Sequence, residues 1–431
     1  MSQQLPRREF LRRSALTGVS LAGVGFWSSV ASAAPKSPNE KLNIGVIGTA
    51  NQAEFSIENV QGENIVALCD IDETFLGKAA KKFPQAKTYH DFRKLFEQKD
   101  IDAVVVATPD HNHAPATAAA LHLVKHVYCE KPLTHTVYEA RIIADLAMKV
   151  KVATQMGTQI HAGSNYRRVV EVIQSGAIGA VSEVHTWVGK GWGGGERPKD
   201  TEKIPPQIHW DFWLGPAPER PYNHVYLPAN WRRWWDFGGG TLADMACHHV
   251  DLPFWALKLQ APATVEAEGP AVHPETCPLG LIVRYEFPQR GNLPPVKLTW
   301  YDGNKAPKTL HDINVPPGGG NMFVGDKGIL VSDYDKYKLF PEQNFAGFTP
   351  PPKTIPDSIG HHAEWLRACR TGEPTTCSFD YSGALTETVL LGNVAYRAGQ
   401  KLEWDATELK AKNCPAADKL LRIEYRSGWT L

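Results

Sequence analysis

The sequence predicts two α/β-type domains: a doubly wound parallel sheet, followed by an α+β domain with a mostly antiparallel, open sheet. Short apolar runs alternate with amphipathic segments over residues 41–160, which is typical of parallel strands joined by helices. After Gly176 the strand-like runs alternate in polarity instead, as in a sheet with one solvated face. The 431 residues are enough for two domains that each have a core.

In the first domain, the expected strands are the runs NIGVI, NIVALCD, DAVVVAT, HVYCE and KVATQ. They occupy residues 43–47, 64–70, 102–108, 126–130 and 151–155. The segments between them, such as 73–83, 113–124 and 136–150, carry apolar residues at helical spacing. The alternation therefore predicts helices on both faces of the sheet.

The second domain is expected over residues 161–404. It opens with a half-buried strand at 180–191, and a long loop rich in Trp, Pro and Gly follows over 192–237. One helix is predicted over 241–259, then several strands to about residue 341 and two more helices near 361–369 and 381–399. An irregular C-terminal arm is expected over 405–431.

The N-terminus has the composition of an export signal. Arg7 and Arg8 precede a modest apolar run that ends in Ala31-Ser32-Ala33, which resembles a twin-arginine signal peptide over residues 1–33. A membrane anchor is the alternative, but the run is short and weakly apolar for a membrane span. We therefore expect a periplasmic protein with no stable membrane insertion after signal cleavage.

Charge and cysteine usage restrict the partners and the redox chemistry. The formal net charge is zero and no basic cluster follows residue 34, which argues against a nucleic-acid partner. The seven cysteines show no CxxC or zinc spacing. We expect them to be mostly free and buried, because twin-arginine export carries proteins already folded in the reducing cytosol; a Cys369–Cys377 bridge is the alternative.

The loop after the first strand is a degenerate dinucleotide-binding fingerprint. Gly48, Ala50 and Ala53 occupy the three glycine positions of G-x-G-x-x-G, so two glycines are replaced. Asp70 ends the second strand, where an acid binds the ribose hydroxyls of NAD and repels the 2′-phosphate of NADP. Together these features predict a Rossmann domain that binds NAD in preference to NADP, with an affinity that the two alanines lower.

Two further motifs carry a family resemblance. The triplet Glu130-Lys131-Pro132, preceded by TPDHNHAPATAAAL, and the segment WWDFGGGTLADMACHHVD at 234–251 resemble the Gfo/Idh/MocA family of oxidoreductases. The resemblance covers nearly the whole mature chain, with departures at Ala50, Ala53 and Ala246. It implies that Lys131, Asp244 and His248 are catalytic. It also implies that the cofactor is lined by Gly48, Thr49, Ala50, Asn51, Asp70, Thr108, Pro109, Asn112, His113, Glu130 and Lys131.

Oxidising a secondary alcohol requires a base for the hydroxyl proton. Asp244 and His248 are four residues apart and would share a helix face, with Asp251 one turn further. A carboxylate that orients the imidazole makes His248 the expected base, and Lys131 is the rival. The same residues could instead hold a metal or form a buried structural pair, but no third separate ligand is evident, so no metal site is predicted.

The substrate side is rich in tryptophan, and indole faces suit sugar rings. Seven tryptophans lie between Thr186 and Trp235, most of them expected in the core. The substrate-binding candidates are Gln159, His161, Tyr166, Trp231, Arg232, Asp244 and His248. The resemblance implies a carbohydrate or polyol substrate, and a homodimer or homotetramer that assembles through the open sheet.

Export adds a constraint, because free NAD is scarce outside the cytosol. The sequence therefore favours an exported NAD-dependent sugar, glycoside or polyol oxidoreductase that keeps its cofactor bound and recycles it internally. The long loop and the C-terminal arm are expected to bury the cofactor. The alternatives are an NAD-assisted glycoside hydrolase or lyase on the same fold, against which Lys131 argues, and a non-enzymatic sugar-binding protein.

Overall fold

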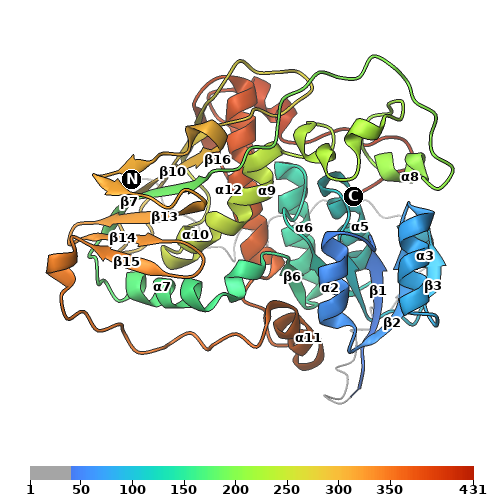
Figure 1. Cartoon of the computed structure of the whole chain (residues 1–431), viewed down its shortest axis with the longest axis horizontal. Coiled ribbons are helices and arrows are strands. Elements are labelled where there is room, and N and C mark those ends of the chain that lie inside the picture. The colour runs from blue at the N-terminus through green and yellow to red at the C-terminus, as the bar shows by residue number, and fades with distance from the viewer. Residues whose placement is uncertain (1–39) are drawn as a thin grey trace, which may run out of the picture. The chain divides into compact units, whose positions relative to one another are not determined.

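The computed structural model describes residues 40–431 (Figure 1), so the proposed signal peptide lies outside the described residues. The first sheet has six parallel strands in the order β3-β2-β1-β4-β5-β6. Their bounds are β1 Asn43–Ile47, β2 Asn64–Cys69, β3 Lys87–Tyr89, β4 Ala103–Val106, β5 His126–Cys129 and β6 Thr154–Met156. The predicted doubly wound sheet is confirmed, and its strand order reverses between β1 and β4, where such sheets bind dinucleotides.

Helices cover both faces of this sheet: α2 Gln52–Val60, α3 Glu73–Lys82, α4 Phe92–Leu95, α5 His113–His122 and α6 Val137–Val150. A capping box starts α6, since the Thr136 hydroxyl accepts from the Glu139 amide (3.2 Å) and Glu139 accepts from the Thr136 amide (2.8 Å). The sequence analysis missed β3 and α4, because a three-residue strand and a four-residue helix are too short to show a period.

The second sheet has nine strands in the order β15-β14-β13-β7-β10-β9-β8-β16-β17. Neighbouring strands are antiparallel except for the parallel pair β7 and β10, which confirms a mostly antiparallel sheet. Their bounds are β7 Val181–Val188, β8 Thr264–Glu268, β9 Ile282–Phe287, β10 Val296–Asp302, β13 Gly319–Gly325, β14 Ile329–Ser332, β15 Tyr337–Phe340, β16 Leu402–Asp405 and β17 Lys410–Ala411. A separate hairpin comprises β11 Thr309–Leu310 and β12 Ile313–Asn314.

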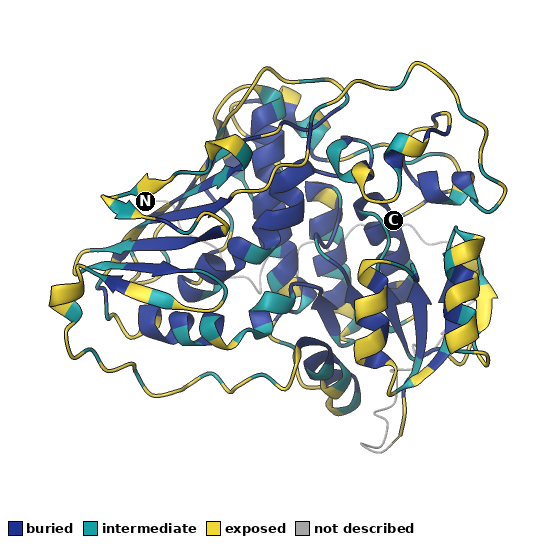
Figure 2. Cartoon of the chain, in the orientation of Figure 1, coloured by how far each residue is buried: buried dark blue, intermediate teal, exposed yellow. Residues whose placement is uncertain are grey.

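The remaining helices are α7 Ser164–Gln174, α8 Trp210–Leu214, α9 Gly240–His249, α10 Asp251–Ala256, α11 His361–Thr371 and α12 Phe379–Ala398. Of these, α8 and α11 lie against the first domain (Figure 1). Short 3₁₀ segments are η1 Asp110–Asn112, η2 Gln159–Ala162, η3 His224–Tyr226, η4 Asn230–Arg233, η5 Gly303–Lys305, η6 Glu342–Phe345 and η7 Pro415–Leu420. Helix α12 is buried along most of its length (Figure 2). It packs closely on α6 of the first domain at Gly383, where a Cβ would lie only 2.8 Å from Ala144 Cβ.

The single helix predicted over 241–259 is wrong in one respect. It divides at Val250 into α9 and α10, and Asp251 begins the second helix. Pro253 stands in the first turn of α10, where its missing amide hydrogen costs no intrahelical bond. Asp251 does not join the group expected on the shared face, because its carboxylate bonds His161 and Tyr381 while Asp244 bonds Lys131.

All seven cysteines are buried and free, as the sequence favoured, and the alternative Cys369–Cys377 bridge is not formed. Among residues 40–431, no helix is long and apolar enough to cross a membrane.

Candidate functional site

A cavity of about 500 Å³ opens at the carboxyl ends of β1, β2 and β4. Eight of the expected cofactor residues line it: Gly48, Thr49, Ala50, Asn51, Asp70, Thr108, Pro109 and Asn112. His113, Glu130 and Lys131 are not among its lining residues. The cavity lies where the strand order reverses, which is the place for a dinucleotide in this type of sheet.

The loop that starts this cavity is tightly turned. Gly48 has a φ of +86°, and a Cβ there would collide with the carbonyl of Ala107, so this position requires glycine. Asn51 has φ 57° and ψ −116°, a conformation that is essentially restricted to glycine and is strained for other residues. The first glycine of the fingerprint is therefore kept for geometric reasons, and Ala53 is accommodated as a fully buried residue of α2.

Asp70 holds this loop in place. One carboxylate oxygen accepts from both the amide and the hydroxyl of Thr49, each at 2.8 Å, and the other accepts from the Asp72 amide at 3.0 Å. Burial raises the pKa of Asp70, although these hydrogen bonds oppose the shift. The carboxyl group lines the cavity at the end of β2, where it would face the adenosine ribose of a dinucleotide.

Asn112 also lines the cavity, but its amide packs against the long loop. Its Nδ2 donates to the Trp213 carbonyl at 3.0 Å, and its buried Oδ1 lies against Gly215, where a Cβ would collide with it. The tightly turned loop and the acid at the end of β2 together fit the NAD that the sequence predicts.

The second domain covers this cavity. Its far wall contains Ile208, Phe212, Trp213, Tyr222, His224, Leu227, Pro228 and Trp429, from the long loop and the C-terminal arm. The loop is tied to the first domain, since Asp72 forms a β-bridge with Ile208 and the His111 ring bonds the Trp213 carbonyl at 2.8 Å.

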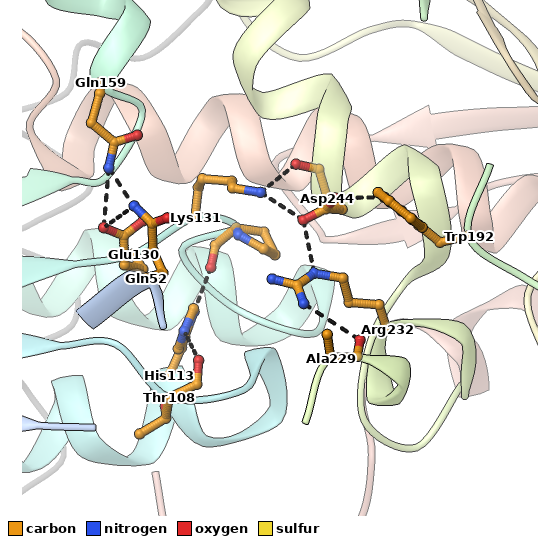
Figure 3. Close-up of polar contacts among 11 residues, drawn as sticks. Gln52, Thr108, His113, Glu130, Lys131, Gln159, Trp192, Ala229, Arg232 and Asp244 are labelled. Carbon is orange, nitrogen blue, oxygen red and sulfur yellow. Dashed lines mark hydrogen bonds and ion pairs between the residues drawn. The ribbon is translucent and has the colours of Figure 1, made fainter. Parts of the chain in front are cut away.

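Lys131, which follows β5, meets the α9 helix across the domains (Figure 3). Its Nζ donates to the Asp244 backbone carbonyl (2.6 Å) and to Asp244 Oδ1 (2.7 Å). Asp244 Oδ1 also accepts from Arg232 Nε at 3.0 Å, and Oδ2 accepts from Trp192 Nε1 at 2.7 Å. Burial disfavours the charged carboxylate, but Lys131 and Arg232 hold the pKa of Asp244 well below its usual range.

The expectation that Asp244 orients the His248 ring is therefore wrong. The carboxylate holds Lys131, Arg232 and Trp192, and no hydrogen bond joins it to His248 among the described residues. His248 is half-buried, and burial and the nearby Lys131 charge lower its pKa well below the ordinary value. Its imidazole is therefore neutral at pH 7 and has an acceptor nitrogen, and the lowered pKa makes it a weaker base than an ordinary histidine.

A buried carboxyl group beside these residues was not nominated from the sequence. Asp110 is 4% exposed, and burial raises its pKa to about 8 even though Arg232 and Lys131 oppose the shift. It lies inside the TPDHNH motif, but nothing in the spacing distinguishes it from the neighbouring polar residues. Trp192 was also missed as a site residue, because only the tertiary structure brings its indole to Asp244.

Several other candidates occupy different positions. Gln159 donates to Glu130 at 3.0 Å, and His161 pairs with Asp251 at 2.9 Å in a buried network. The Tyr166 hydroxyl donates to the His248 backbone carbonyl at 3.1 Å and so helps to hold the end of α9. Trp231 is buried, and the Arg232 guanidinium stacks on its ring.

The metal alternative on α9 does not assemble. His249 bonds the Tyr334 hydroxyl at 3.0 Å and Asp251 faces His161, so Asp244, His248 and these two residues do not converge on one point. Within the described chain, two other groups place three ligand-type atoms together: Glu73, His90 and His209; and Glu183, His185 and His311.

His113 connects the TPDHNH motif to the Glu130-Lys131-Pro132 motif, and it makes the free energy of unfolding depend on pH. Its ring nitrogens lie 2.8 Å from the Thr108 carbonyl and 2.7 Å from the Pro132 carbonyl, and burial lowers its pKa to about 4. The unfolded chain takes up this proton near pH 6.5, so stability is lost as pH falls from about 6.5 to about 4, at about 1.4 kcal/mol per pH unit.

We expect His113→Asn to remove this contribution from the pH dependence of urea unfolding between pH 7 and 4.5. The exposed His122→Asn is the matched control and should leave the slope unchanged. Equal slopes for wild type and His113→Asn would contradict the prediction.

Comparison with known proteins agrees with this geometry. Residues 42–158 match the family model described as "Oxidoreductase family, NAD-binding Rossmann fold" (GFO_IDH_MocA), and residues 162–291 match its "C-terminal alpha/beta domain". These features define an oxidoreductase of the dinucleotide-binding class. The chain belongs to the Gfo/Idh/MocA family, and its first domain is the NAD-binding domain of that family.

Curated relatives match part of the chain. An inositol 2-dehydrogenase from Salmonella paratyphi B is 32% identical over 146 residues, which is 33% of this chain and 43% of the relative. A glycosyl hydrolase family 109 protein from Solibacter usitatus is 31% identical over 200 residues, 40% of this chain and 44% of the relative. The chain thus spans less than half the length of the curated relatives it matches.

Among solved structures, the WlbA dehydrogenase of Chromobacterium violaceum in complex with NADH and UDP-GlcNAcA has a TM-score of 0.62 at 16% identity, over 86% of this chain and 98% of that chain. At this identity the likeness concerns the fold alone.

Proposed function

We propose that the protein is an exported NAD-dependent dehydrogenase that oxidises a secondary hydroxyl of a sugar, glycoside or polyol and retains its cofactor between turnovers. The Lys131–Asp244 pair carries the proposal, because it joins the Glu130-Lys131-Pro132 motif after β5 to helix α9 of the second domain. The matched inositol 2-dehydrogenases support a polyol or sugar as substrate.

Bound NAD supplies the hydride acceptor for such a reaction. The chain itself has to bind the hydroxyl and take its proton. His248, with its neutral imidazole, is our proposed proton acceptor. The Lys131 ammonium, oriented by Asp244, would donate a hydrogen bond to the substrate oxygen and stabilise the negative charge that develops there.

Cofactor retention is supported by the cover over the cavity. Trp429 is 8% exposed, and its ring packs on Phe92 and beneath the Arg93 guanidinium at 4.3 Å. Arg93 also donates to the Gly428 carbonyl at 2.9 Å, and Arg426 donates to the Gly215 carbonyl at 3.1 Å. The C-terminal arm is thus bonded to both the first domain and the long loop, which supports our proposal that these contacts slow the release of a dinucleotide.

We expect Trp429→Ala to accelerate NADH dissociation about 10-fold or more, since losing one large apolar contact costs roughly 1.5–3 kcal/mol. The rate is read from the loss of NADH fluorescence after mixing with excess NAD. The exposed Thr430→Ala is the control. An unchanged rate in Trp429→Ala would show that the arm does not retain the cofactor.

The direct test is to purify the protein without added nucleotide, denature it and quantify the released NAD(H) and NADP(H) by chromatography. We expect near-stoichiometric NAD(H), and slow dissociation of it. A protein that is empty and does not bind added NAD would overturn the proposal and favour a non-enzymatic sugar-binding protein. Detection of the twin-arginine-dependent periplasmic form tests export separately.

The glycosyl hydrolase family 109 relative favours one alternative, NAD-assisted cleavage of a glycosidic bond. Release of 4-nitrophenol from 4-nitrophenyl glycosides by the holoenzyme, without net reduction of NAD, would support it. Oxidation of a free sugar or polyol with stoichiometric formation of NADH would support the dehydrogenase.

A further inference from the structure

Trp192 is held by its indole nitrogen and is partly exposed to solvent. Its Nε1 donates to Asp244 at 2.7 Å, and its backbone amide donates to the Thr241 hydroxyl at 2.6 Å. The residue is nevertheless 39% exposed, whereas Trp187 and Trp234 are buried. An immobilised indole with exposed surface, directly beside a candidate catalytic carboxylate (Figure 3), is suited to stacking on a sugar ring.

The charges around this indole are unbalanced. Lys131, Arg232 and Lys190 are cationic, and Asp244 is the carboxylate that faces the first two. Lys190 is exposed and forms no ion pair within residues 40–431, so its positive charge is not balanced by a carboxylate there. Asp110 is protonated at pH 7 because burial raises its pKa to about 8, so it offsets little of this charge.

The backbone of Lys190 and the guanidinium of Arg232 are both held in place by nearby residues. Lys190 is two residues before Trp192, and its carbonyl accepts from the Gly303 amide at 2.8 Å, which holds the base of the loop against the end of β10. Arg232 stacks on Trp231 at 4.3 Å, which fixes its guanidinium beside Asp244. Two cations thus share the single Asp244 carboxylate beside Trp192, and an exposed lysine stands two residues before Trp192 on a backbone that is held in place. This excess of positive charge would attract an anionic substrate.

We propose that the substrate is a carbohydrate ring that carries a carboxylate, with the ring stacked on Trp192 and the carboxylate directed to Lys190. The inference rests on the proposed function and specifies its substrate class. It assigns to Trp192 and Lys190 the contacts that select the substrate. These are distinct from the proton transfer assigned to His248 and from the charge stabilisation assigned to Lys131.

The test uses the holoenzyme and matched pairs of probes that differ only in the charged group. Binding of methyl glycosides of glucose, galactose and mannose is compared by calorimetry with that of the corresponding methyl uronosides, at low ionic strength. In at least one pair we expect the uronoside to bind about 10-fold more tightly than its neutral partner, and we expect salt to reduce the difference.

Two variants separate the contacts. Lys190→Gln should bring the ratio of the two affinities close to one, whereas the exposed Lys308→Gln should leave it unchanged. Trp192→Ala should weaken both members of the pair about 10-fold, and Trp192→Phe, which keeps a flat ring, should preserve most of the binding.

The inference is overturned if no uronoside in the panel binds more tightly than its neutral partner, including the case in which none binds. It is also overturned if Lys190→Gln keeps the preference. Either result, in a protein that retains NAD and oxidises a neutral sugar, leaves the proposed dehydrogenase standing. Failure to hold NAD would instead contradict the proposed function.

Discussion

Lys131→Met lowers kcat/KM by about 10³-fold in our expectation, because it removes the ammonium that would bind the substrate oxygen and stabilise its charge. The side chain is 13% exposed and is held by Asp244 at 2.7 Å, so it is positioned before the substrate arrives. Lys131 does not line the dinucleotide cavity, and we expect NAD content to stay within about twofold of wild type.

The measurement pairs steady-state kinetics with chromatography of released nucleotide. Lys149→Met, an exposed lysine on α6, is the control for the loss of one positive charge. If Lys131→Met turned over normally, neither the proposed role of this lysine nor the reaction assigned to the site would hold. If its only defect were loss of NAD, Lys131 would be a cofactor-binding residue instead.

Asp244→Asn has the largest expected effect on stability. The carboxylate is 11% exposed and faces two cations, Lys131 and Arg232, which are 13% and 30% exposed. Neutralising it leaves these two charges near each other without a counter-ion. We expect the free energy of unfolding to fall by about 2–3 kcal/mol after allowance for the exposure of Arg232. Asp211→Asn, whose carboxylate is 69% exposed, should cost about 0.5 kcal/mol or less.

A double-mutant cycle shows whether the loss is electrostatic. The double variant Lys131→Met/Asp244→Asn lacks one of the two uncompensated cations. Its loss of unfolding free energy should therefore be smaller than the sum of the two single losses, by about 1 kcal/mol or more. Urea unfolding of the four proteins measures this. Strict additivity would mean that the Lys131–Asp244 pair contributes nothing beyond its two separate side chains.

The features of this fold that follow from short stretches of sequence were predicted correctly. The parallel sheet, the antiparallel sheet, the dinucleotide loop and Asp70 were all predicted from strand-length apolar runs and from a fingerprint with two glycines missing. These features depend on residues a few positions apart, and the period of a strand or helix is visible in such a window. The same rules failed at α9 and α10, because one apolar pattern can continue through a break between two helices.

The sequence by itself determined which domain binds NAD and which residues, Lys131, Asp244 and His248, carry the family's motif. Only the tertiary structure decided how they are partnered. Asp244 meets Lys131 113 positions earlier in the chain and Trp192 52 positions earlier, and Trp429 reaches the wall of a cavity that begins at Ile47. Partners at such separations are selected by the packing of whole helices and sheets, and no local period in the sequence records that packing.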